Sequence, residues 1–218
     1  MAETFEKPKG FKKKIENFWY HYKIPALLGL FFLGSALFLG IDVVKTKNPD
    51  MVVTYVSEKY GDESQFRRIE PEFYDILGDI NGDGKTKVNY RLILMREKSF
   101  FNGGMDIEQS YNYSFLDKNV RLYFLEDAYF PARQAYFEPL EGILPEECLA
   151  NGLKNEEGQV CAVPLAGTKA GKEMQMDRPE MYVAVKRIMD TEKRDSLVAV
   201  QHEKAKEIIK FMMEEDEA

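Results

Sequence analysis

Residues 24–41 read IPALLGLFFLGSALFLGI, an uncharged apolar stretch that decides how the rest of the chain is organised. Eighteen residues of α-helix, at about 1.5 Å each, span about 27 Å, close to the hydrocarbon thickness of a bilayer, about 30 Å. Val43 and Val44 extend the stretch, and three aromatic residues precede it, where interfacial aromatic residues are typical: Trp19, Tyr20 and Tyr22. The sequence therefore predicts a transmembrane helix over residues 24–44.

The charges beside this stretch predict its orientation. Six lysines precede it, and short basic flanks stay in the cytoplasm: Lys7, Lys9, Lys12, Lys13, Lys14 and Lys23. We expect a cytoplasmic basic segment over 1–23, the transmembrane helix over 24–44, a linker over 45–50, and an extracytoplasmic domain over 51–213 with an acidic tail at 214–218. The expected location is a single-pass protein of the cell membrane. A cleaved signal peptide fits less well, because its apolar region is about 7–15 residues long and ends in small residues.

The chain beyond Lys47 is long enough for one domain with its own core. Residues 48–218 contain 22 Lys and Arg against 33 Asp and Glu, a formal net charge of −11. An acidic domain without a basic stripe argues against nucleic-acid binding, which depends on neutralising phosphates. The sequence also contains no nucleophile elbow and no paired metal-binding histidines, so we do not expect an enzyme.

Strand-like and helix-like patterns alternate along this domain. Strands are expected over 51–57, 87–95, 121–125, 159–164 and 181–188, and helices over 62–77, 106–115 and 202–213. Pro71 is expected to split or kink the first of these helices. Strands separated by helices predict a single α/β domain with parallel crossovers.

The segment Asp79-Ile80-Asn81-Gly82-Asp83-Gly84-Lys85 matches the opening of a calcium loop. Oxygen ligands fall on alternate positions, Asp79, Asn81 and Asp83, and a glycine makes the turn. The twelfth position, where such a loop supplies a bidentate glutamate, is Tyr90. Two interpretations stay open: a calcium site completed by a carboxylate from elsewhere, or a tight turn between helix and strand.

Cys148 and Cys161 are the two cysteines of the chain, and both fall in the domain expected outside the cytoplasm. An oxidising compartment permits a disulfide between them, which would stabilise the fold by about 3 kcal/mol in the chain-entropy model. The alternative is two thiols.

Several short motifs together resemble a group of uncharacterised membrane-anchored proteins of Firmicutes. They are an N-terminus like KIENFWYHYKIPALLGLFF, the following KNPDMVVTYVSEKY, the NGDGK turn within Asp79–Lys85, the strand RLYFLEDAYF, and the pair Leu144–Pro145 and Pro164–Thr168. The external domain in turn resembles part of a type 2 periplasmic solute-binding fold. At this length the resemblance implies about one lobe of that fold, and a recognition module associated with an ABC transporter.

Together these features predict a membrane-anchored extracytoplasmic recognition module that resembles a solute-binding protein. Its expected partners are the lipid bilayer, a small solute, and an ABC transporter or another envelope protein. The alternatives are a structural or regulatory subunit of a membrane complex that binds no small molecule, and, less favoured, an envelope hydrolase.

Overall fold

The computed structural model describes residues 10–45, 49–59, 61–95 and 107–214, without the side chains of residues 13, 14, 17 and 36–45. The chain divides into two units, Met1–Lys47 and Asn48–Ala218.

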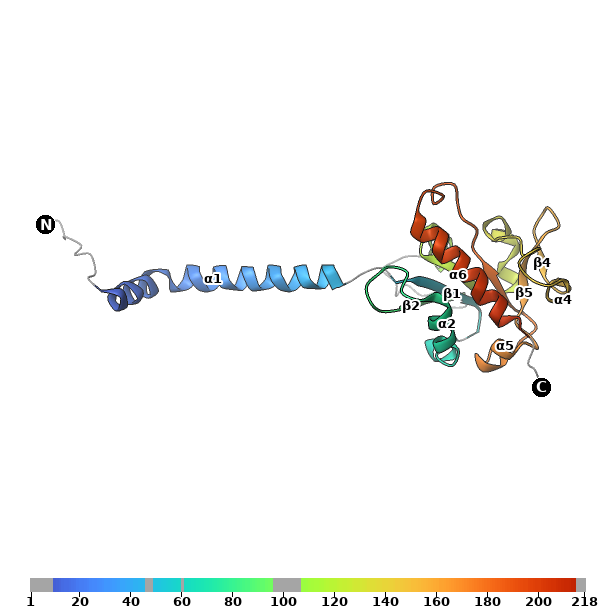
Figure 1. The fold of residues 1–218 in the computed structure, drawn as a ribbon, viewed down its shortest axis with the longest axis horizontal. Helices are drawn as coiled ribbons and strands as arrows, with labels where there is room; N and C mark the ends of the chain where they lie inside the picture. Colours follow the sequence, from blue (N-terminus) through green and yellow to red (C-terminus); the bar gives the residue numbers. More distant parts are fainter. Residues whose placement is uncertain (1–9, 46–48, 60, 96–106, 215–218) are drawn as a thin grey trace. The chain divides into compact units, whose positions relative to one another are not determined.

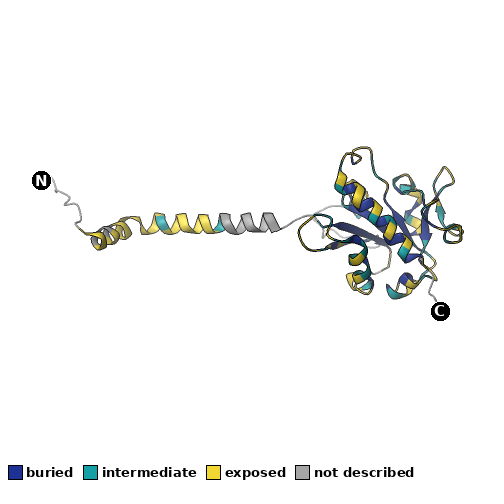
Figure 2. Cartoon of the chain, in the orientation of Figure 1, coloured by how far each residue is buried: buried dark blue, intermediate teal, exposed yellow. Residues whose placement is uncertain are grey.

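The first unit contains one helix, α1 (Phe11–Lys45), which includes the expected span and part of the basic segment before it. Its described large apolar side chains are exposed, as the yellow colour along most of the described part of α1 shows (Figure 2). Among the residues whose side chains are described, no helix has an apolar stretch of the length needed to cross a membrane. Residues 36–44 of the expected span lie outside the described side chains.

The second unit is a mixed α/β domain built on one six-stranded sheet with the order β2-β1-β3-β6-β5-β4. The strands are β1 (Met51–Ser57), β2 (Val88–Leu94), β3 (Val120–Glu126), β4 (Leu153–Lys154), β5 (Val160–Pro164) and β6 (Met181–Val185). β1 pairs in parallel with β2 and with β3, whereas β6 is antiparallel to β3 and β5, and β4 is antiparallel to β5.

Helices cover both faces of this sheet (Figure 1). On one face, α2 (Glu70–Leu77), α5 (Lys169–Glu173) and α6 (Ser196–Met212) contribute Phe73, Leu77, Ala170 and Ile208 to a core with Met51, Val53 and Phe124. On the other face, α3 (Ile107–Leu116) packs Tyr111 and Phe115 against Tyr123 and Phe137. We name these the α2 face and the α3 face. Short helices complete the domain: η1 (Glu63–Gln65), η2 (Asp127–Tyr129), η3 (Pro131–Tyr136) and α4 (Glu146–Leu149).

The expected strands and helices are confirmed in position, with differences at two places. The expected helix over 62–77 is two helices, and α2 begins beside Pro71, which supplies no backbone N–H and fits the first turn. α6 begins six residues earlier than expected, where the Asp195 carboxylate accepts a hydrogen bond from Leu197 N.

The expectation of parallel crossovers throughout is wrong for the second half of the sheet. The connection from β5 to β6 contains α5, a helix of five residues. At about 1.5 Å per residue this helix is about 7.5 Å long, too short to return the chain along the sheet for a parallel pairing. β6 therefore runs antiparallel to β5.

Candidate functional site

The carboxyl ends of β1 and β3 form the topological switch point of the sheet. From β1 the chain continues to β2 on one side of β1, and then crosses to β3 on the other side. In open α/β sheets, ligands bind outside the carboxyl ends of the strands at such a point. The residues gathered here are therefore the candidate site, and we call them the carboxyl-edge network: Tyr55, Ser57, Glu58, Lys59, Glu126, Arg178 and Glu180.

A buried carboxylate lies at the centre of this network. Val56 pairs with Leu125, so the next residues, Ser57 and Glu126, end their strands side by side. The Ser57 hydroxyl donates to Glu126 Oε1, and the backbone N–H of Glu58 donates to Glu126 Oε2 at 3.1 Å. Both oxygens of the carboxylate are thus held in place.

Arg178 reaches this carboxylate from the loop between α5 and β6. Its guanidinium donates to the Tyr55 hydroxyl at 2.9 Å and lies 3.6 Å from both Glu126 Oε1 and Glu180 Oε1. Gly61 packs closely against the Tyr55 ring, and an added Cβ at that position would collide with the ring. Arg178 is therefore oriented by three polar partners, while a fifth of its side chain, 21%, stays exposed.

Lys59 forms the outer part of the network. Its ammonium group donates to Glu180, and 62% of its side chain is exposed. This hydrogen bond lowers the pKa of Glu180, which stays ionised at neutral pH. On the other side, the Tyr129 hydroxyl donates to Glu58 at 2.9 Å, and burial together with this bond raises the pKa of Tyr129. The network thus presents cations and carboxylates beside one another at the solvent boundary.

A second charged cluster lies at the opposite end of β3, and we call it the amino-edge cluster. Glu192 accepts from Arg121 and from Lys186, each at 3.0 Å, and Lys186 also donates to the carbonyl of Asp117 at 3.0 Å. The side chains of Arg121 and Lys186 are 0% exposed. Burial lowers the pKa of Lys186. Burial alone would raise the pKa of Glu192, but the hydrogen bonds from both cations lower it. A solute in water cannot reach these cations.

The expected calcium loop is organised by its own backbone. Asp79 accepts from Asp83 N at 3.0 Å and from Gly84 N at 2.6 Å, and Asp83 accepts from Lys85 N at 3.0 Å. Asp50, which is fully buried, accepts from Ile80 N, Asn81 N and Lys87 N at 2.8–2.9 Å. Within the described ranges, no three histidine, cysteine or acidic side chains gather as a metal site. Asp79, Asn81 and Asp83 lie in one turn, and calcium binding there stays a prediction.

The structure does not join Cys148 to Cys161. Cys148 packs beside the core of the α2 face and Cys161 is buried in the core of the α3 face, so the sheet separates the two sulfur atoms. Burial raises the pKa of the Cys161 thiol to about 11. The expected disulfide is therefore not formed in this structure.

Sequence reasoning missed the carboxyl-edge network. Ser57 and Glu126 end two expected strands, and this was the available signal, because the carboxyl ends of neighbouring parallel strands lie together. Arg178 and Glu180 carried no such signal, since they belong to a loop that returns from elsewhere in the chain.

Comparisons of this chain with protein families, curated proteins and solved structures find no match. The geometry and chemistry of its own residues therefore carry the functional argument.

Proposed function

We propose that this chain is a membrane-anchored extracytoplasmic recognition module whose α/β domain binds a small polar solute at the carboxyl-edge network. The observation that carries the proposal is the exposure of Arg178 and Lys59 at the topological switch point. The guanidinium offers donors in a planar fork that suits a carboxylate or another acceptor group. Glu58 and Glu180 lie beside it and would accept from hydroxyl or ammonium groups of the same solute. Amino acids and sugars have this combination of groups.

Two features of the N-terminal unit support the anchor. The sequence of residues 24–44 is apolar apart from Ser35 and Asp42, and the large apolar side chains described within it are exposed: Ile24, Leu27, Leu28, Leu30, Phe31, Phe32 and Leu33. A helix with apolar side chains all round needs protein or lipid around it. The lysines before the span favour a cytoplasmic N-terminus and an extracytoplasmic domain. The proposed partner of a domain placed there is an ABC transporter or another envelope protein.

A thermal-shift screen of the full-length chain in detergent tests solute binding. Amino acids, sugars and short peptides are added, with Arg178→Ala as the matched variant. A solute at 100 times its dissociation constant stabilises the folded state by about 2.7 kcal/mol, which raises the midpoint measurably. We expect a shift that Arg178→Ala removes. The absence of any shift would contradict solute binding and favour a subunit that binds no small molecule.

Carbonate extraction of membranes tests the anchor separately. The full-length chain should stay in the membrane pellet, and its release into the supernatant would contradict the anchor.

A further inference from the structure

The two edge strands of the sheet differ in length. β4 has two residues, whereas β2 has seven and pairs with β1 alone in the part of the chain that the structure describes. Native proteins protect their sheet edges with short strands, prolines or free charges, because an open edge is a template for another strand. β2 contains no proline, and its one charged residue, Arg91, is paired with Asp117 at 2.6 Å. The β2 edge therefore lacks these protections.

The backbone of β2 offers hydrogen-bonding groups along this edge. At its two ends the backbone is directed at β1: the Lys87 carbonyl accepts from Asp50 N at 2.9 Å, and Met95 N donates to the Ser57 carbonyl at 2.8 Å. In a parallel pair, the backbone groups of alternate residues point to opposite sides of the strand. The N–H and C=O groups of four residues therefore point outward: Val88, Tyr90, Leu92 and Leu94.

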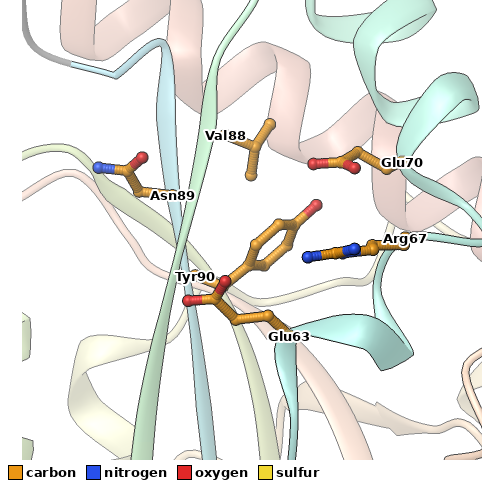
Figure 3. Close-up of a pocket in the computed structure, with 6 residues that line it drawn as sticks. All are labelled: Glu63, Arg67, Glu70, Val88, Asn89 and Tyr90. Carbon is orange, nitrogen blue, oxygen red and sulfur yellow. The ribbon is translucent and has the colours of Figure 1, made fainter.

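A cavity of about 630 Å³ lies beside the first half of this edge, on the α2 face. Figure 3 shows Tyr90 pointing from β2 toward Glu63, Arg67 and Glu70, while Asn89 points away from them. Glu70 accepts from the Tyr74 hydroxyl at 2.5 Å and, with burial, raises the pKa of that tyrosine to about 12. Two carboxylates and one guanidinium line the cavity, which gives it a net negative charge suited to a basic side chain.

A second cavity of about 520 Å³ lies beside the other half of the edge, on the α3 face. It is lined by Leu92 and Ile93 of β2 and by Tyr113 and Leu116 of α3. Tyr113 is 54% exposed and Leu116 is 73% exposed. Among the described residues of the α/β domain, the exposed large apolar side chains are these two and Val200. Two of the three thus border one cavity, which suits an aliphatic side chain.

We propose that the β2 edge binds an extended peptide segment of a partner protein by adding it to the sheet as a strand. The first cavity takes a basic side chain of that segment, and the second takes an aliphatic side chain three residues away. Three residues of a strand span about 10 Å, the distance from Val88–Tyr90 to Arg91–Ile93 along β2. Residues three apart point to opposite faces of a sheet, as the two cavities do.

Charge favours the same occupant. The domain of residues 48–218 has a formal net charge of −11, and it would attract a basic segment and repel an acidic one. The peptide site uses residues different from those of the carboxyl-edge network, so it goes beyond the proposed solute binding. Either site can fail its test without the other.

Selection from a display library of random nine-residue peptides on the full-length chain in detergent tests the proposal. Peptides are counter-selected on the Tyr113→Ser/Leu116→Ser double variant, whose exposed positions leave the core unchanged. The most enriched peptide is synthesised, and its affinity is measured by fluorescence anisotropy against the wild type, Leu116→Ser, Glu63→Lys and Val200→Ser. Val200→Ser is the matched control, because it removes an exposed apolar side chain of α6 that lines neither cavity.

We expect enriched peptides with a basic and an aliphatic residue three positions apart. Leu116→Ser and Glu63→Lys should each weaken binding at least about tenfold, and Val200→Ser should leave it within about twofold of the wild type. Methylating alternate backbone nitrogens of the peptide should abolish binding, because these groups pair with β2. The proposal is overturned if selection enriches no peptide, if the variants bind as well as the wild type, or if the methylated peptide keeps its affinity.

Discussion

The two ends of β3 carry similar charged groups in different surroundings. At the amino end, Arg121 and Lys186 share Glu192 and are shut off from solvent. At the carboxyl end, Arg178 also pairs with carboxylates, but it is partly exposed and lies beside the more exposed Lys59. An ion pair alone therefore indicates no function. Access from solvent separates a cluster that stabilises the fold from one that can contact a solute.

The largest expected effect comes from breaking the amino-edge cluster. Glu192→Gln removes the negative charge that compensates two buried cations, and loss of one member of a buried pair costs about 3–5 kcal/mol of unfolding free energy. Urea unfolding of the full-length chain, followed by circular dichroism, measures the loss. Glu180→Gln is the matched control at the carboxyl edge, where a partly exposed ion pair contributes about 1 kcal/mol or less. Equal losses in the two variants would contradict the comparison.

Asp50→Asn should have the next largest effect. The Asp50 carboxylate accepts three backbone hydrogen bonds with its two oxygens, whereas an asparagine has one acceptor oxygen and would direct its NH₂ group at Lys87 N or at the turn. We expect a loss of about 2–4 kcal/mol, since bonds to charged groups contribute about 1.5–3 kcal/mol each. The same urea titration tests this, and a variant as stable as the wild type would show that Asp50 does not organise the turn.

The amino-edge cluster should also make stability depend on pH. The pKa of Glu192 is lowered in the folded state, so its stabilisation is fully present above the ordinary glutamate pKa. It is lost as the pH falls through the lowered value, because the unfolded chain binds the proton first. Unfolding titrations between about pH 6 and pH 3 should show this loss in the wild type and a shallower dependence in Glu192→Gln. The same slope in both would assign the acid sensitivity to other groups.

Asp83→Ala should have the smallest effect. It removes the hydrogen bond from Lys85 N in an exposed turn, which contributes about 0.5–1.5 kcal/mol. If residues 79–85 also bind calcium, the ion should raise the melting midpoint of the wild type, and the variant should lose this rise. If the wild-type melting midpoint is the same with calcium and with a chelator, residues 79–85 form a turn that binds no calcium.

The sequence predicted the elements of this domain better than their arrangement. The β-branched run of residues 51–57 predicted β1, and Pro71 predicted the break before α2, since both signals act over a few neighbouring residues. The antiparallel half depends on the length of α5, which is too short to show a helical period. Arg178 joins the carboxyl edge only because the chain from β5 to β6 turns back on itself. Glu192 pairs with Arg121, which lies about 70 residues earlier in the sequence. Patterns in a single sequence do not predict contacts at this separation.

The measurement that tests the central claim most directly is the thermal-shift screen of the wild-type chain against Arg178→Ala. The account predicts that at least one small polar solute raises the wild-type midpoint and leaves that of Arg178→Ala unchanged, while Glu192→Gln, although less stable, keeps the solute-dependent shift. A solute that stabilises Arg178→Ala as much as the wild type, or the absence of any stabilising solute, would contradict the assignment of the carboxyl-edge network as the recognition site.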